Sequence, residues 1–136
     1  MRYKSPYELI KGERGDSGYD VRCIDGDILI KPMETMMINT GVKVELPSHI
    51  EAQVRPKSGK SKNGLLVHFG TVDSGYRGNI KVVVTNLNKK TMHIEHMEKI
   101  AQLVFSLKDE VELLKSDDID ENTERGSNGF GSTGRF

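Results

Sequence analysis

The sequence has 136 residues, a length that suits one domain with a single buried core and no need of disulfides. Its 20 basic and 20 acidic side chains give a net charge of zero. The protein therefore has no overall positive potential that would attract nucleic acid or an anionic membrane, and we expect neither as a partner. Cys23 has no second cysteine to pair with, and the first 16 residues hold no apolar run typical of a signal peptide or membrane span, which together favour a soluble, cytoplasmic protein in a reducing compartment.

Short apolar runs rich in β-branched residues follow one another along the chain, whereas apolar stripes of helical period are scarce. We expect strands in six stretches, at residues 27–30, 36–46, 51–55, 79–86, 100–107 and 111–114. Turn-forming residues at 39–41, 46–48 and 86–90 punctuate these runs. Many short strands at this spacing predict an all-β sandwich, jelly roll or barrel.

One short helix and one arm complete the predicted elements. Residues 58–64, SGKSKNG, suit a short helical turn that Ser58 would cap, with its amide hydrogens facing an anion. From Lys115 to Asn128 the sequence becomes acidic and polar, which is too hydrophilic for a core. We therefore expect a β core at residues 1–114 and a flexible C-terminal arm at residues 115–136 that carries a glycine-rich stretch.

The stretch GTVDSGYRGNI, residues 70–80, places a carboxylate and an aromatic ring in one loop between two strands. A positioned carboxylate such as Asp73 can orient and deprotonate a water molecule. From the residues alone, the alternative is an Asx-type turn with Tyr76 at its rim.

Two further stretches suit a phosphate chain. RPKSGKS, residues 55–61, combines cations, hydroxyls and a flexible glycine, although a solvated basic loop has the same composition. RGSNGFGSTG, residues 125–134, offers the guanidinium of Arg125, two adjacent hydroxyls and the ring of Phe130. A disordered glycine-serine tail is the alternative, but an aromatic ring among the glycines argues against a pure linker.

Five stretches together resemble the ordered motifs of trimeric dUTPases over nearly the whole chain: DSGYD at 16–20, RPKSG at 55–59, GTVDSGYRGNI at 70–80, EKIAQLVF at 98–105 and RGSNGFGSTG at 125–134. The resemblance implies an all-β fold, a jelly-roll-like β-barrel of the dUTPase β-clip type, in a homotrimer with exchange of the C-terminal arms. It also implies Mg²⁺-dependent hydrolysis of dUTP to dUMP and pyrophosphate.

The resemblance further implies a role for each matching residue. Asp73 would be the catalytic residue that activates water against the α-phosphorus, and Tyr76 would pack beneath the deoxyribose. The other substrate-binding residues would be Lys57, Ser58, Gly59 and Gln102 at the phosphates, Gly70, Thr71, Val72 and Lys81 on the hairpin at the uracil edge, and Arg125, Phe130, Gly131, Ser132 and Thr133 of the arm, with Phe130 stacked on uracil. Mg²⁺ would be held mainly by the phosphates and water, and Asp20 would act on it only through water.

Two residues depart from the family pattern. Lys57 stands where arginine is usual in the family. A guanidinium can donate two parallel hydrogen bonds to one phosphate, whereas an ammonium acts as a point charge, so we expect weaker phosphate binding here. Met97 stands where glycine is usual, and because a side chain disfavours positive φ, we expect a different turn there.

Two other functions stay open at this point. A dCTP deaminase would have a similar fold, but it needs a glutamate for deamination and lacks the closing Gly-Phe-Gly-Ser-Thr tail. A phage dUTPase that also binds a host repressor would carry the same motifs. A histidine metal site is not predicted, because His93 and His96 would face opposite sides of a strand.

Overall fold

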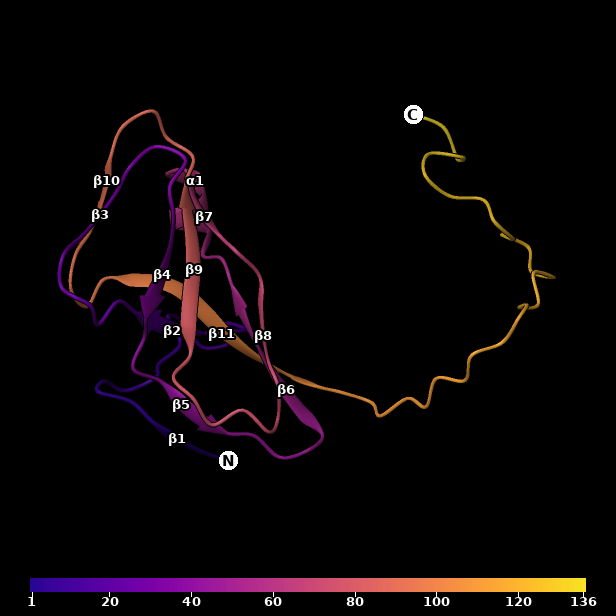
Figure 1. Ribbon diagram of the computed structural model, residues 1–136, viewed down its shortest axis with the longest axis horizontal. Coiled ribbons are helices and arrows are strands. Elements are labelled where there is room, and N and C mark those ends of the chain that lie inside the picture. The colour runs from indigo at the N-terminus through magenta and orange to yellow at the C-terminus, as the bar shows by residue number, and fades with distance from the viewer.

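The computed structural model describes residues 1–136. Eleven strands and one short helix follow in the order β1 (Arg2–Lys4), β2 (Tyr19–Arg22), β3 (Ile28–Ile30), β4 (Thr35–Asn39), β5 (Lys43–Glu45), β6 (Ile50–Arg55), α1 (Ser58–Lys62), β7 (Leu65–Val67), β8 (Gly70–Val72), β9 (Lys81–Asn86), β10 (Met92–Ile94) and β11 (Lys99–Leu107). The strands form one body, and the last residues lead away from it (Figure 1).

Two main antiparallel sheets make up this body. One has the strand order β2-β11-β6-β8 and the other the order β4-β9-β7. The smaller pairs β1-β5 and β10-β3 extend them, and every pairing is antiparallel. The predicted all-β, jelly-roll-like fold is confirmed.

The core lies between the two main sheets, and strands of both sheets contribute buried apolar side chains to it. In β9, for example, Val82 and Val84 are fully buried while Lys81 is exposed. Val21, Val54 and Leu103 of the four-stranded sheet and Ile38, Val82 and Leu65 of the three-stranded sheet belong to one cluster of 21 buried apolar residues.

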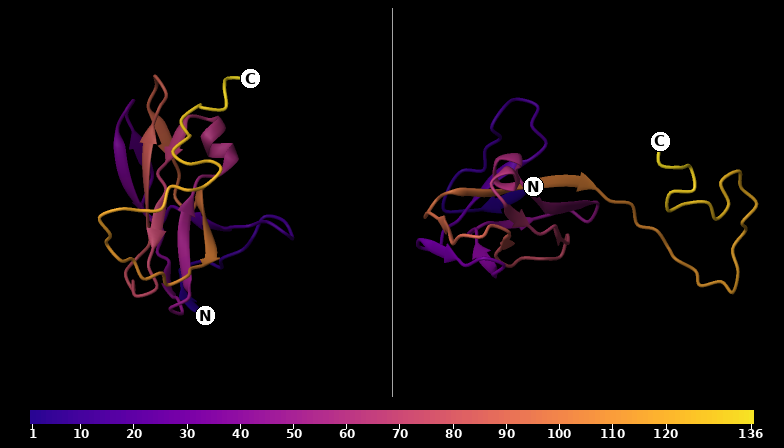
Figure 2. Two further views of the ribbon diagram at one scale, coloured as in Figure 1. Left: turned by 90° about the vertical axis from the view of Figure 1, so that its right-hand side faces the viewer. Right: turned by 90° about the horizontal axis from the view of Figure 1, so that it is seen from above.

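The secondary structure at the end of the chain differs from the prediction. β11 ends at Leu107, and no strand or helix follows it, so the strand predicted at residues 111–114 is wrong. Val111, Leu113 and Leu114 are exposed instead, because no strand of this chain lies beside them to pair with. Residues 109–136 run clear of the body in the view from above (Figure 2, right).

The helix also begins differently from the prediction. Ser58 is its first helical residue, and the N-cap is Lys57, which keeps an extended backbone and makes no capping hydrogen bond. The prediction that Ser58 caps the helix is therefore wrong, since a capping hydroxyl requires a residue outside the helix. Five strands, β1, β2, β7, β8 and β10, were absent from the predicted set, because three or four residues are too few to show a period.

Candidate active site

One hollow of about 300 Å³ gathers the predicted catalytic residue, the tyrosine predicted beneath the deoxyribose and the hairpin residues predicted at the uracil edge. Its lining includes Gly70, Thr71 and Val72 from β8, Asp73 and Tyr76 from the turn that follows, and Lys81 from the start of β9. Met37, Val54, Asn79, Ile80 and Val83 complete the wall. Pairing of β8 with β6 and of β9 with β4 fixes the two strands that bound the hollow.

The turn between β8 and β9 holds the Tyr76 ring in a defined place. The Tyr76 amide donates to the Asp73 carbonyl at 3.0 Å, and the Tyr76 hydroxyl donates to the Asn79 carbonyl at 2.9 Å. A Cβ atom at Gly78 would collide with the Tyr76 hydroxyl and ring, so glycine is needed beneath it. The ring stays about half exposed and available to a ligand.

Asp73 presents an exposed carboxylate at the edge of this hollow. No salt bridge within the chain engages it. Its neighbour Ser74 accepts, through Oγ, a hydrogen bond from Lys108 Nζ at 3.1 Å, which anchors the turn to the residue that follows β11. The arrangement leaves Asp73 free to orient water or a cation-bound ligand.

A second cluster forms where β2, β11 and β6 lie side by side. In the register of these strands, Gln102 lies opposite Asp20 on one side and opposite Arg55 on the other. The Gln102 side chain donates to the Pro56 carbonyl at 2.9 Å, directly before the turn that contains Lys57. Gly18 is buried under Gln102, and any side chain there would overlap it.

Asp20 is the charged centre of this cluster. It is only 3% exposed, and its two oxygens meet the ammonium groups of Lys57 and Lys99. The Lys57 contact is a hydrogen bond, whereas Lys99 lies 2.7 Å from Oδ2 as an ion pair without hydrogen-bond alignment. Burial alone raises the pKa of the Asp20 carboxyl, but the two lysines outweigh it, and the pKa lies below its usual value.

Lys99 is a site neighbour that sequence reasoning missed. It stands three residues before Gln102 in the stretch EKIAQLVF, but its ion pair with Asp20 spans 79 positions and follows only from strand pairing. A second ion pair, between Lys60 and Glu98, lies beside it. Burial is the largest single influence on the Glu98 carboxyl and raises its pKa, but the contacts that favour the charged form, led by the hydrogen bond from Lys60, together outweigh it. The pKa of Glu98 therefore lies below its usual value.

The two clusters are separate within one chain. β6 pairs Val54 with Gly70 and Ala52 with Val72, so Asp73 lies past the Ala52 end of the ladder while Lys57 lies past the Arg55 end. In this register Asp73 lies level with position 51 of β6, six positions before Lys57. At a rise of about 3.3 Å per residue, the two residues lie roughly 20 Å apart. Within one chain the two clusters therefore lie at opposite ends of β6.

The predicted arm residues lie away from both clusters. Arg125 donates through Nε to the Asn128 carbonyl at 2.9 Å, a contact within the arm itself. Phe130 is fully exposed, and Gly131, Ser132 and Thr133 are exposed beside it. The structure therefore brings Asp73, Tyr76 and the β8 residues together, and Lys57 with Asp20 and Gln102, but leaves the arm residues apart.

Met97 differs from expectation in its backbone. Its φ is 66°, the left-handed conformation that glycine favours, so the prediction of a different turn is wrong. The Met97 amide donates to the Cys23 carbonyl at 2.6 Å, and the Met97 carbonyl accepts from Arg22 Nη1 at 2.9 Å. These hydrogen bonds from both sides hold the turn in place despite its side chain.

The chain's own residues offer a magnesium ion little direct ligation. No group of three or more histidine, cysteine, aspartate or glutamate side chains gathers in the structure. Asp20 is engaged by two lysines, which suits a contact through water rather than a direct ligand bond.

No helix is long and apolar enough to cross a membrane.

Comparison with solved structures defines the class of fold. The chain is similar to a mutant of the Staphylococcus bacteriophage 80alpha dUTPase with dUpNHpp, with a TM-score of 0.90, 24% identity and coverage of 98% of each chain. At that identity the likeness establishes the fold, which is the jelly-roll-like fold of that dUTPase.

Sequence comparison establishes the family. The dUTPase family model matches residues 8–134. The deoxyuridine 5'-triphosphate nucleotidohydrolase of Hydrogenobaculum sp. is 44% identical over 123 residues, which cover 88% of this chain and 85% of that protein. The enzyme of the same name from Fusobacterium nucleatum is 44% identical over 133 residues, 94% of this chain and 90% of that protein. The chain belongs to the dUTPase family.

Proposed function

We propose that this protein hydrolyses dUTP to dUMP and pyrophosphate, with Asp73 activating the water that attacks the α-phosphorus. The observation that carries the proposal is the hollow that joins the Asp73 carboxylate, the Tyr76 ring and the backbone of β8. An exposed carboxylate without an ion-pair partner remains able to accept a proton from water.

Each part of the hollow has a role in this proposal. The backbone of Gly70, Thr71 and Val72 would meet the uracil edge, with Lys81 on the facing strand. Tyr76 would pack beneath the deoxyribose, where a held ring leaves no room for a 2′-hydroxyl.

The second cluster would bind the phosphates. Lys57 supplies positive charge, and Ser58 with Gly59 supplies amide hydrogens from the first turn of α1, which have no acceptor inside the helix. Gln102 holds this turn through the Pro56 carbonyl. Mg²⁺ would arrive with the triphosphate, contact Asp20 only through water, and offset phosphate charge.

The separation of the clusters supports assembly. Because Asp73 and Lys57 lie about 20 Å apart in one chain, a single nucleotide would use the hollow of one copy and the phosphate turn of another. We propose a homotrimer in which the residues 1–114 provide these parts. The arm, residues 115–136, would add Arg125, Phe130, Gly131, Ser132 and Thr133 as a lid over bound nucleotide.

A deaminase is the less suitable alternative. Deamination by a dCTP deaminase would require a glutamate in the nucleotide site, and no glutamate lines the hollow around Asp73. Nothing in the geometry favours a repressor-binding role, so the proposal is confined to hydrolysis.

Pyrophosphate release from dUTP, dCTP, dTTP and UTP, measured side by side, tests the proposal. We expect turnover of dUTP only, and a loss of about 10²–10⁴-fold in Asp73→Asn, because the amide cannot take the proton from water. Asp109→Asn is the matched control, since Asp109 is an exposed residue that follows β11 and lies outside the site, and it should retain the parent rate. Parent-like turnover by Asp73→Asn would overturn the assignment.

A further inference from the structure

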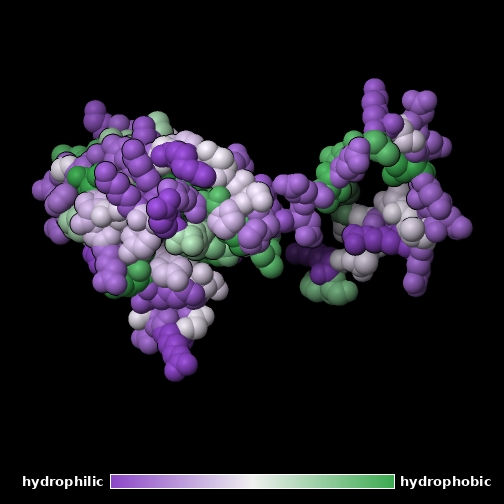
Figure 3. Space-filling model, turned by 90° about the horizontal axis from the view of Figure 1, so that it is seen from below, coloured by the Kyte–Doolittle hydropathy of each residue, from purple (hydrophilic) through white to green (hydrophobic).

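The charges of the chain are divided unevenly between its core and its end. Residues 1–108 hold 17 basic and 12 acidic side chains, whereas residues 109–136 hold three basic and eight acidic ones. The end of the chain stands apart from the core (Figure 3), and no salt bridge joins the two. The core therefore presents an excess of positive charge that the neutrality of the whole chain hides.

The lysines nearest the proposed phosphate turn are largely neutralised by carboxylates. Lys57 and Lys99 share the Asp20 carboxylate, and Lys60 forms an ion pair with Glu98. Three cations and two carboxylates leave one net positive charge in this group. Further attraction of a triphosphate over a distance has to come from cations outside these pairs.

Four lysines without salt-bridge partners gather at the end of the body that contains α1 (Figure 1). Lys31 directly follows β3, and Lys62 is the last residue of α1. Lys89 and Lys90 lie on the loop between β9 and β10, and all four side chains are exposed. The Glu34 carboxylate accepts a hydrogen bond from the Lys31 amide at 2.7 Å, but positive charge remains in excess. We call the four lysines the lysine patch.

Hydrogen bonds from two asparagines hold the elements of the lysine patch together. Asn86 is fully buried, and its side-chain nitrogen donates to the carbonyls of Ile30 and Lys90, each at 2.8 Å. The side-chain nitrogen of Asn88 donates to the carbonyl of Asn63, directly after α1, at 2.9 Å. These bonds join the ends of β3, β9 and α1, so the backbone that carries the four lysines has a fixed place relative to the phosphate turn.

The hollow beside the lysine patch has no negatively charged lining. It measures about 430 Å³, and Lys89, Lys90 and His93 supply all of its titratable side chains. No phenylalanine, tyrosine or tryptophan lines it, so a nucleic-acid base would find no such ring to stack on. The lining therefore suits a small polyanion better than a nucleic acid.

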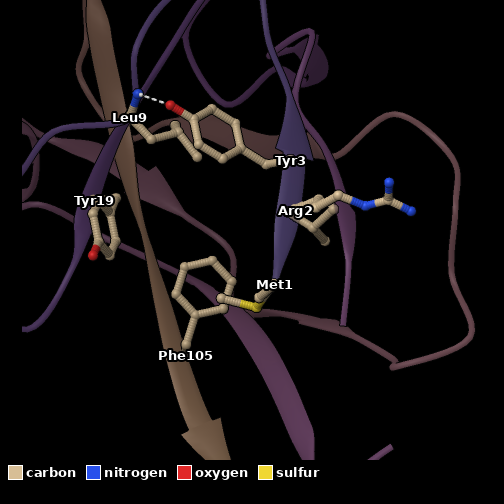
Figure 4. Close-up of a pocket in the computed structure, with 7 residues that line it drawn as sticks. Met1, Arg2, Tyr3, Leu9, Tyr19 and Phe105 are labelled. Carbon is tan, nitrogen blue, oxygen red and sulfur yellow. Dashed lines mark hydrogen bonds between the residues drawn. The ribbon is translucent and has the colours of Figure 1, made fainter. Parts of the chain in front are cut away.

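An apolar hollow of about 200 Å³ on β1 and β5 has the opposite character (Figure 4). The Phe105 and Tyr19 rings in its wall meet edge to face at 5.8 Å. Its single cation, Arg2, is paired with Glu45 at 2.9 Å and points away from these rings in Figure 4. This hollow offers a triphosphate no free cation, so the lysine patch matches a polyanion better than this hollow does.

The length of α1 sets the distance between the lysine patch and the phosphate turn. The helix has five residues, so at about 1.5 Å per residue Lys62 lies roughly 6 Å beyond Ser58 along its axis. The Debye length at physiological ionic strength is about 8 Å, so the field of Lys62 reaches the turn with only partial screening. Lys89 follows Asn88, which is hydrogen-bonded to the residue after α1, and its charge adds to this field.

We propose that the lysine patch attracts the triphosphate of an incoming nucleotide through its electric field and so raises the rate at which the nucleotide reaches the phosphate turn. The four ammonium groups are not part of the turn, so the patch acts before binding rather than on the bound ligand. This inference rests on the proposed function and deepens it, because it assigns capture of the substrate to residues outside the site.

A graded series of charges on the loop between β9 and β10 tests the proposal. Lys89→Gln with Lys90→Gln removes two positive charges, and Lys89→Glu with Lys90→Glu reverses them. At an ionic strength of about 0.01 M, where the Debye length is about 30 Å, kcat/KM for dUTP should fall about threefold in the first variant and about tenfold in the second, with kcat unchanged. At about 1 M, where the Debye length is about 3 Å, both variants should match the parent.

Lys89→Arg with Lys90→Arg is the matched control, because it keeps both positive charges on the same loop and should follow the parent at every ionic strength. Equal values of kcat/KM in all variants at low ionic strength would overturn the proposal. A loss of kcat/KM that persisted at about 1 M, or a loss of kcat, would overturn it as well, since either result would indicate a direct contact or a structural role.

Stopped-flow association of a non-hydrolysable triphosphate analogue of dUTP, followed by tyrosine fluorescence, separates this proposal from the proposed function because it requires no turnover. Charge reversal should lower the association rate constant about tenfold at low ionic strength and leave the dissociation rate constant unchanged. Faster dissociation with unchanged association would show that the patch contacts the bound ligand, which contradicts the proposal. A parent protein that binds the analogue but does not hydrolyse dUTP would contradict the proposed function alone.

Discussion

Met97 combines a side chain with a left-handed backbone, φ 66°, in the turn that leads into β11. Such a conformation costs a non-glycine residue about 1–2 kcal/mol. The hydrogen bonds from Met97 to Cys23 and from Arg22 to Met97 offset this cost, because they hold the turn from both sides. The turn therefore keeps the backbone shape that glycine favours and leads directly into β11 at Lys99.

Met97→Gly should raise the free energy of unfolding by about 0.5 kcal/mol, since relief of backbone strain exceeds the added entropy of the unfolded chain by a small margin. Denaturant unfolding at one fixed protein concentration measures this difference. Glu95→Gly is the control in the same turn, because Glu95 does not have positive φ, and it should lower stability by about 0.5–1 kcal/mol. A loss of stability in Met97→Gly would show that the side chain contributes more packing than strain.

At the scale of elements, one buried carboxylate joins three parts of the fold. Asp20 of β2 meets Lys99 of β11 and Lys57 at the N-cap of α1. The pairing places two partly exposed cations beside the proposed phosphate turn. It also makes the position of α1 depend on the protonation state of Asp20.

Asp20→Asn should lower the free energy of unfolding at pH 7 by about 1–2 kcal/mol, a modest loss because both lysines are partly exposed and regain water. The pKa of Asp20 is lower in the folded state, so its contribution is present above the ordinary carboxyl pKa of about 4 and is lost as pH falls through the folded value. Unfolding curves from pH 7 to pH 3 should therefore converge for the parent and variant.

The control for this experiment is Asp27→Asn, whose carboxylate is largely exposed beside His93 and should contribute little. If parent and Asp20→Asn curves stayed parallel down to pH 3, the two lysines would not be stabilising the Asp20 charge.

At the scale of the whole molecule, the arm and the core are chemically different bodies. The core has one buried cluster of 21 apolar residues, whereas every large apolar side chain of the arm is exposed. The core should therefore fold without the end of the arm, while the reaction should depend on it.

A chain that ends at Glu124 should fold and assemble as the parent does, because it loses a polar, glycine-rich stretch whose apolar residues, Phe130 and Phe136, contact no core residue. Turnover of dUTP should fall by about 100-fold or more, since the cut removes Arg125 and the groups proposed to position the triphosphate. Light scattering and turnover measured on one sample test both expectations. Smaller particles would show a structural role for the removed stretch, and undiminished turnover would exclude it from the site.

The amino-acid sequence alone was sufficient to predict the features that depend on residues close together in the chain. Short apolar runs rich in β-branched residues predict β9 and β11, because such side chains favour an extended backbone whatever lies beside the strand. Asp73 and Tyr76 lie three positions apart in one turn, so their shared hollow was also predictable from the sequence. The dUTPase motifs were readable for the same reason.

Features that depend on distant residues were decided by the tertiary structure. Residues 111–114 have the pattern of a strand but form none, because a strand requires a partner that this part of the chain lacks. Lys99 meets Asp20 only because β2 and β11 pair in one register, and a shift of one residue would turn these side chains to opposite faces. The separation of Asp73 from Lys57 likewise follows from the pairing of β6 with β8. Local spacing carries no information about which strands will lie side by side, so the sequence determined the chemical groups and the tertiary structure determined which of them meet.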